Sequence, residues 1–152
     1  MKKIIIIVIA LFLLNNCGYS PIYSSKNNNF YIKEISQKDR SKLNTKIVNN
    51  IERFSNQNSE NIIQLEISSN KKIDIILKDK KGDPSKFQMT IFLNINILNK
   101  NNYEINKTKS FSANFNYNNN SDKFSLKQYE TEIENILINK IVEESIIYLS
   151  EL

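Results

Sequence analysis

The sequence predicts an α+β fold, a two-layer sandwich in which a four-stranded, mainly antiparallel sheet carries two helices on one of its faces. The expected order of elements is β-α-β-β-β-α. Three central segments alternate apolar and polar residues, so each strand has one solvent-exposed face and the sheet is covered on one side only. Two other segments repeat apolar residues at helical spacing and supply that cover. A chain of 152 residues that is 40% hydrophobic fits one domain with a core.

The first sixteen residues have the pattern of an export signal. Met1-Lys2-Lys3 is a positive start, and an unbroken apolar run follows from Ile4 to Leu14. Eleven helical residues cover only about 16 Å of a hydrocarbon layer about 30 Å thick, so the run is too short to span a membrane. We expect residues 1–16 to be a lipoprotein signal peptide that is cleaved.

Cys17 is the only cysteine and lies three residues after the apolar run, where a bacterial lipoprotein signal places its acylated thiol. We expect diacylglycerol and an N-acyl chain on Cys17 as its only covalent group, with no other cofactor. Two or three acyl chains on one residue make attachment to a membrane stable. Asn15 and Asn16 stand where small residues are usual, so the alternative is an incidental Cys17 after an ordinary signal peptide.

The next segment predicts a tether, a strand and a helix. Residues 17–29 read as an extended, lipidated N-terminal tether, and the domain itself is expected over 30–152, beginning with a strand from about Phe30 to Ile35. Ser36 and Asp39 resemble a capping box. The helix that follows has a narrow apolar stripe and a basic side, which we interpret as a solvated face rather than a binding site. The stripe consists of Leu43, Ile47, Ile51 and Phe54, and the basic side of Arg40, Lys42, Lys46 and Arg53.

Three alternating segments form the rest of the sheet. In the first, an apolar face continues after Ser68-Ser69-Asn70. The second alternates over six apolar positions, Phe87 to Ile97, and Asn99 to Asn102 makes a tight connection, because Asn tolerates positive φ. The third runs from Tyr103 to Tyr117. The residues that share one face of the first segment are Ile63, Leu65, Ile67, Ile73, Ile75 and Leu77, and those that face the same way in the third are Phe111, Ala113, Phe115 and Tyr117.

From Ser125 to the C-terminus the apolar period returns to that of a helix. The apolar face is wide, and Glu residues lie opposite it. Residues 122–152 carry a net charge of −4 and residues 17–121 a net charge of +7, so any anion-binding surface belongs to the earlier part. The apolar face consists of Leu126, Tyr129, Ile133, Ile136, Leu137, Ile141, Ile147, Tyr148 and Leu152.

Composition argues against an enzyme. The chain has no His, which is the commonest general base and metal ligand. It has two Gly and two Pro, no glycine-rich nucleotide fingerprint and no paired metal-ligand spacing. Ile, Asn and Lys supply almost half of the residues, a bias typical of an A/T-rich genome, so the Lys content alone does not indicate a nucleic-acid partner. We expect no enzymatic activity, no metal and no nucleic-acid binding.

Several motifs resemble the alphaproteobacterial LPS-assembly lipoprotein family LptE. The start Cys17-Gly18-Tyr19-Ser20-Pro21-Ile22-Tyr23 is similar to the lipidated start of that family. The likeness continues through the turn at 82–86, the hairpin at 99–102, the strand end at 113–118 and the final helix. It covers nearly the whole chain, and the order of the motifs is more specific than any one of them.

The resemblance implies a non-enzymatic, LptE-like domain over 30–152. Such a lipoprotein sits as a plug inside the outer-membrane β-barrel LptD, helps its assembly and takes part in lipopolysaccharide transport. Its partners would be an LptD-like barrel, lipopolysaccharide and, through the anchor, lipid of the outer membrane on the periplasmic side. Cys17 is followed by Gly18 and not by Asp. In this respect the chain resembles lipoproteins that are transferred to the outer membrane.

A Lys-rich turn is the candidate contact for lipopolysaccharide phosphates or for the barrel lumen. Its residues are Lys78, Lys80, Lys81 and Lys86. The alternative is a solvated hairpin loop. For the whole chain, the alternatives are another outer-membrane lipoprotein scaffold or barrel-assembly accessory, and a soluble periplasmic ligand-binding or enzymatic domain whose Cys17 is never acylated.

Overall fold

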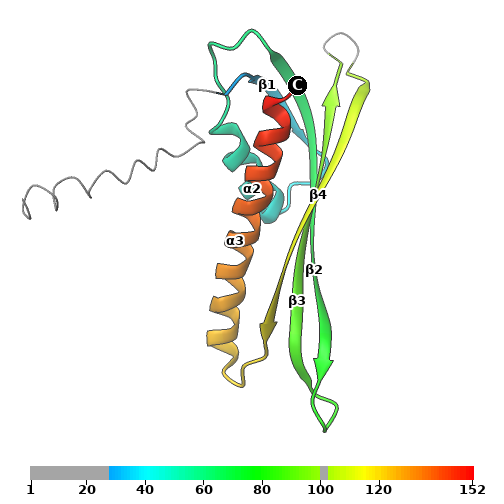
Figure 1. Ribbon diagram of the computed structural model, residues 1–152, viewed down its shortest axis with the longest axis vertical. Coiled ribbons are helices and arrows are strands. Elements are labelled where there is room, and N and C mark those ends of the chain that lie inside the picture. Colours follow the sequence, from blue (N-terminus) through cyan, green and yellow to red (C-terminus); the bar gives the residue numbers. More distant parts are fainter. Residues whose placement is uncertain (1–27, 100–102) are drawn as a thin grey trace, which may run out of the picture.

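A computed structural model describes residues 28–99 and 103–152 and confirms the α+β class (Figure 1). The signal peptide, Cys17 and the tether up to residue 27 lie outside the described residues. The elements follow the expected order. They are β1 (Tyr31–Gln37), α2 (Lys42–Glu52), β2 (Ile62–Lys78), β3 (Pro84–Leu98), β4 (Ile105–Asn118) and α3 (Lys123–Ser150).

The sheet is mixed, with the strand order β1-β2-β3-β4. β1 pairs with β2 in parallel, whereas β2, β3 and β4 are antiparallel to their neighbours. A parallel pair needs a crossover connection, and α2 lies within that connection, between β1 and β2 in the chain. Both helices pack on the same face of the sheet, and no helix or strand of the described residues lies on the other face (Figure 1).

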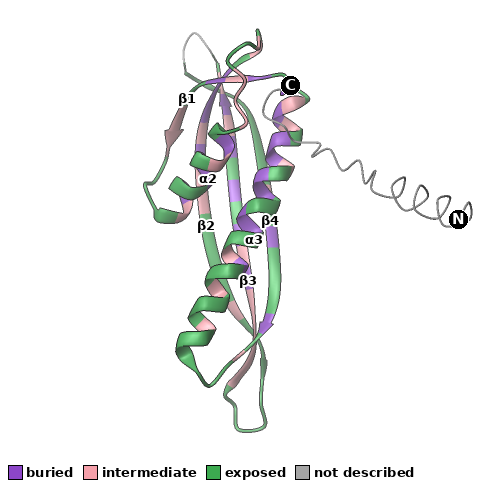
Figure 2. Cartoon of the chain, turned by 90° about the vertical axis from the view of Figure 1, so that its left-hand side faces the viewer, coloured by how far each residue is buried: buried purple, intermediate pink, exposed green. Residues whose placement is uncertain are grey.

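The core occupies the single face between the sheet and the helices. The register sets alternating residues of neighbouring strands opposite each other, for example Leu65 opposite Ile97 and Ile91 opposite Ala113. Figure 2 shows the resulting buried stripe along the strands and α3. The buried alternating face is therefore confirmed along β3. Ile73, Ile75 and Leu77 of β2, expected on the same apolar face, are instead 41%, 50% and 57% exposed, because this end of the β2–β3 hairpin extends beyond the start of α3 (Figure 1). The fully buried apolar side chains include Ile47, Ile51, Leu65, Ile67, Met89, Ile91, Leu93, Ile95, Ile133 and Ile141.

The polar segment Ser68–Asn70 does not interrupt β2, because the sheet pairing with β3 continues through it. The Ser69 hydroxyl donates a hydrogen bond of 3.0 Å to Oδ1 of Asn44, a fully buried residue of α2. The Asn44 amide in turn donates to the backbone carbonyl of Asp39 at 2.8 Å. Ser69 and Asn44 are therefore both hydrogen-bonded on the core side, which offsets the cost of burying them.

One local prediction was wrong in detail. The cap of α2 is Ser41, whose side chain accepts from the backbone amide of Asn44 at 3.1 Å, because Ser36 instead continues β1 opposite Glu66. In the β3–β4 connection, Asn101 and Asn102 lie outside the described residues, and Tyr103 beside them has a positive φ of 57°. Its amide donates to the carbonyl of Asn99 at 3.1 Å, and this bond closes the turn.

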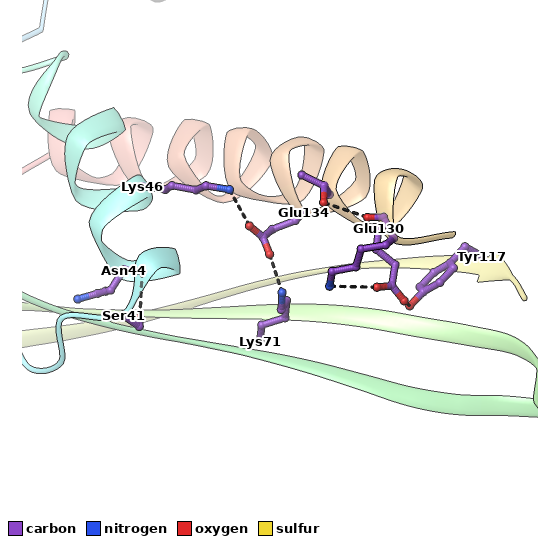
Figure 3. A network of polar contacts seen from close by, with 9 residues as sticks. Ser41, Asn44, Lys46, Lys71, Tyr117, Glu130 and Glu134 are labelled. Carbon is purple, nitrogen blue, oxygen red and sulfur yellow. Dashed lines mark hydrogen bonds and ion pairs between the residues drawn. The ribbon is translucent and has the colours of Figure 1, made fainter. Parts of the chain in front are cut away.

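Glu134 of α3 joins the two helices to the sheet. Its carboxylate accepts from Lys46 of α2 at 2.8 Å and from Lys71 of β2 at 2.6 Å (Figure 3). Partial burial by itself raises the pKa of this carboxyl, but the hydrogen bonds and charges of the two lysines outweigh that effect, so the pKa of Glu134 lies below 4.5. The ionised form is therefore the one that the fold stabilises.

Removing this charge should destabilise the protein in a pH-dependent way. Because the pKa of Glu134 is lower in the folded state, its contribution is present above pH 4.5 and is lost as the pH falls through the folded value. We expect Glu134→Gln to lower the free energy of unfolding by about 1 kcal/mol at pH 7, a modest figure because water still reaches the pair. Urea unfolding at pH 7 and at about pH 3 checks this, since the two proteins should converge at the lower pH.

The matched control is Glu143→Gln on the same helix. Glu143 is exposed and takes part in no ion pair among the described residues. It should leave the unfolding free energy nearly unchanged at both pH values. An equal loss for both variants, or a loss for Glu134→Gln that persists at low pH, would contradict the assigned role.

Candidate functional site

The described chain enters the domain at a fixed point. Asn28 is buried, donates through Nδ2 to the carbonyl of Phe54 at 2.9 Å and accepts from Nδ2 of Asn56 at 3.0 Å. Both partners follow α2 directly. Cys17 lies outside the described residues, so its acylation stays a prediction. A chain anchored at that residue would be held to the domain at the end of the sheet that carries β1.

The Lys-rich turn lies at the opposite end of the sheet, where β2 and β3 form a hairpin tip that extends beyond the start of α3 (Figure 1). A strand of 17 residues such as β2 spans about 55 Å, which sets the scale of the separation from β1. The tip is built around Asp79. Its carboxylate accepts from the backbone amides of Lys81 at 2.8 Å and Asp83 at 2.9 Å.

Gly82 completes the turn with a φ of 90°, the left-handed region that glycine reaches without strain. Its amide donates to the carbonyl of Asp79 at 3.1 Å. The side chains on either side of Gly82 therefore project outward from a fixed backbone loop. A Lys in such a loop keeps its ammonium group in water, where it can meet an anion.

The structure brings three of the four predicted lysines together at the tip. Lys78, Lys80 and Lys81 are exposed, and none of the three takes part in an ion pair within the described part of the chain. Sequence reasoning missed the two carboxylates of the same turn. With Asp79 and Asp83 included, residues 78–86 carry a net charge of +2 rather than +4.

Lys86 lies apart from the tip. It lines a shallow hollow of about 580 Å³ between the end of β4 and the start of α3, together with the rings of Tyr117 and Tyr129. Asn119, which also lines this hollow, donates through Nδ2 to the carbonyl of Pro84 at 2.7 Å and fixes its floor. One cation beside several amides offers hydrogen-bond donors to an anionic oxygen.

The edge of this hollow is held by Tyr117 and Glu130. The Tyr117 hydroxyl donates to the Glu130 carboxylate at 2.8 Å (Figure 3). Burial, and then the bond to the Glu130 carboxylate, raise the pKa of Tyr117 well above its ordinary value. The phenol therefore stays a neutral donor at physiological pH and acts as a structural link rather than as a base.

Among residues 28–99 and 103–152, no three side chains of the ligating types His, Cys, Asp and Glu are grouped as a metal site would require. No helix in the same ranges is long and apolar enough to cross a membrane.

The fold is shared with bacterial lipoproteins. No protein-family model matches the chain. No curated protein matches its sequence. Among solved structures, the chain is similar to a minor lipoprotein of Acinetobacter baumannii, with a TM-score of 0.61 and 10% identity over 82% of this chain and 92% of that one. It is also similar to lipoprotein B of Nitrosomonas europaea, with a TM-score of 0.59 and 13% identity over 77% of this chain and 80% of that one.

A rare lipoprotein B of Shewanella oneidensis gives a TM-score of 0.54 and 12% identity over 78% of this chain and 94% of its own. These structures are matched over most of their length, so the likeness concerns the whole sandwich and not one motif. At sequence identities of 10–13%, this structural likeness shows a shared fold.

Charge reversal at the hairpin tip tests its affinity for anions. We expect Lys80→Glu with Lys81→Glu to weaken binding to purified lipopolysaccharide by about tenfold or more in low salt. The difference should shrink as ionic strength rises, because exposed charges are screened. Lys38→Glu with Lys42→Glu is the matched control with the same change in charge; both lysines are exposed, Lys38 directly after β1 and Lys42 at the start of α2. Equal binding by both double variants at low salt would remove the tip from the site.

Proposed function

We propose that this protein is a lipid-anchored outer-membrane lipoprotein that plugs and helps assemble an LptD-like β-barrel and takes part in lipopolysaccharide transport. The observation that carries the proposal is a fold shared with bacterial lipoproteins in a chain whose only cysteine stands at the acylation position of a lipoprotein signal. The motifs that resemble LptE point from that broad class to the barrel partner.

The open face of the sheet supports contact with a polar wall. Its side chains are mainly amides and hydroxyls that bond to one another across the strands, as in the pairs of Ser110 with Asn94 at 2.7 Å and Thr108 with Asn96 at 2.8 Å. The interiors of outer-membrane barrels are polar. Along β3 from Gln88 to Asn96 and along β4 from Thr108 to Asn118, this face has no charged side chain, so this part can lie against such a wall without burying unpaired charge. On β2 the same face carries Glu66, Lys72 and Asp74.

The shape of the domain supports a plug that reaches through a barrel. The outward apolar band of an outer-membrane barrel is about 25 Å tall, and β2 spans about twice that length. With Cys17 in the membrane and the entry point at Asn28 near β1, the cationic tip would lie at the far end. There Lys78, Lys80 and Lys81 would meet lipopolysaccharide phosphates.

The proposal requires no catalytic group. Its only covalent addition is the diacylglycerol and N-acyl chain on Cys17, and its partners are the barrel, lipopolysaccharide and the lipid around the anchor. A different outer-membrane scaffold or barrel-assembly accessory is the second candidate, because the shared fold indicates a class of lipoproteins and not a particular partner.

Intact mass of the protein recovered from bacterial membranes tests the anchor. We expect a mature chain that begins at Cys17 and is heavier than its sequence by several acyl chains. Cys17→Ser should leave the chain unacylated and release it from the membrane fraction. A mature wild-type chain of unmodified mass would reject the anchor and favour the soluble periplasmic alternative.

Affinity capture from solubilised outer membranes tests the barrel. We expect one large β-barrel protein to be recovered in an amount comparable to the bait, and depletion of the lipoprotein to impair lipopolysaccharide export selectively. Recovery of the acylated protein alone would contradict the plug. If depletion instead lowers the levels of many barrels together, the accessory role is the correct one.

A further inference from the structure

α2 and the second half of α3 leave an apolar groove between them, where the two helices lie side by side (Figure 2). Phe54, which follows α2, and Val142 and Ile146 of α3 supply its apolar lining, and Asn50 and Asn139 lie at its polar borders. Its volume of about 350 Å³ is near the lower limit of pockets that hold a ligand. The groove therefore suits one or two apolar side chains of a narrow segment.

The chain enters the domain beside this groove. The Phe30 carbonyl accepts from the backbone amide of Asn56 at 2.9 Å. Two residues earlier, Asn28 donates through Nδ2 to the carbonyl of Phe54 at 2.9 Å. Followed backwards, the entering chain thus moves from Asn56 toward Phe54 and the end of α2. The residues that precede Asn28 are therefore attached directly at the groove.

We propose that residues 20–27 of the same chain dock in this groove as a strap, with the ring of Tyr23 between α2 and α3. Tyr23 is five residues before Asn28, so it reaches up to about 18 Å from that point. Along α3 the groove extends from Asn139 to Ile146, which is about 10 Å. The whole groove is thus within reach of Tyr23. Because Asn28 holds the strap there, its effective concentration exceeds that of a separate chain.

The strap and the groove are chemically complementary. Pro21-Ile22-Tyr23 is the only run of three apolar or aromatic residues in residues 17–29. The border of the groove carries Arg53 and Glu143, and neither takes part in an ion pair within the described part of the chain. An arginine guanidinium packs favourably on an aromatic ring, which Tyr23 supplies. The Glu143 carboxylate attracts an ammonium group, and Lys26 is the only charged residue of the same stretch.

Docking of the strap would shorten the link between the domain and its expected anchor. Eleven residues separate Asn28 from Cys17 and span up to about 40 Å, whereas six residues separate Tyr23 from Cys17 and span about 20 Å. A docked strap would therefore hold the α2 end of the domain near the acylated residue and restrict its orientation. The docking itself goes beyond the proposed barrel partnership, because it concerns one chain on its own.

Disulfide formation between the strap and α3 tests the docking. The chain from residue 17 on, with Cys17→Ser, has no thiol other than those introduced, so neither acylation nor a barrel enters the test. Tyr23→Cys with Asn139→Cys should close an intramolecular disulfide under mild oxidation about tenfold faster than Tyr23→Cys with Glu144→Cys. Glu144 lies five residues further along α3, about 140° around the helix and outside the groove. An undocked segment would reach both positions at similar rates.

Trypsin gives a second readout that needs no introduced thiol. Docking shields the bond after Lys26, so Ile22→Ser with Tyr23→Ser should release residues 17–26 about fivefold faster than the unchanged strap, as followed by mass spectrometry. Tyr103→Ser with Ile105→Ser makes the same change at two exposed residues near the start of β4 and should leave that rate unchanged. Free peptides of residues 17–29 with either strap sequence correct for the preference of the protease.

Equal rates of disulfide formation with Asn139→Cys and with Glu144→Cys would overturn the proposal. Unchanged release of residues 17–26 by trypsin from the Ile22→Ser, Tyr23→Ser variant would also overturn it. A disulfide between Tyr23→Cys and Asn139→Cys that joins two chains, instead of closing within one, would assign the groove to a second copy.

Discussion

Burial of a single face of β2, β3 and β4 is the constraint on which the other features depend. The side chains of Leu65, Ile91 and Ile95 are fully buried on that face, and the opposite face has amides and hydroxyls in register. A one-residue slip would exchange the two faces, so the register is strongly specified. The two helices are needed because this apolar surface has to be covered, and their placement leaves the second face free for contact.

The polar contacts between the helices and the sheet also depend on the burial of this single face. A sandwich this long keeps α2 over part of the sheet only, and Glu134 joins α2, α3 and β2 where their surfaces meet. The Ser69 hydroxyl donates a hydrogen bond to Asn44 on the core side of the sheet, so the polar segment of β2 makes a specific contact with α2. Such pairs favour one alignment of the helices on the sheet, because any other alignment would leave buried groups without partners.

The two ends of the sandwich carry the residues on which the proposed function depends. The entry point at Asn28 and the cationic tip at Lys80 and Lys81 lie at opposite ends of the sheet (Figure 1). One molecule could therefore be anchored at one end and meet an anionic ligand at the other.

The sequence by itself determined the class of fold, the order of elements and the alternation of β3, because period-two and period-3.6 patterns are local properties of the chain. It also placed the Lys-rich turn, since Gly82 and Pro84 are strong turn residues. Only the tertiary structure decided that β1 is parallel to β2, that Ser41 rather than Ser36 caps α2 and that the Asp79 carboxylate accepts from the backbone amides of the Lys-rich turn. It also decided that Ile136 stays exposed. These features depend on which surfaces meet across the chain, and the width of a helix's apolar face does not reveal how much of that face its neighbours cover.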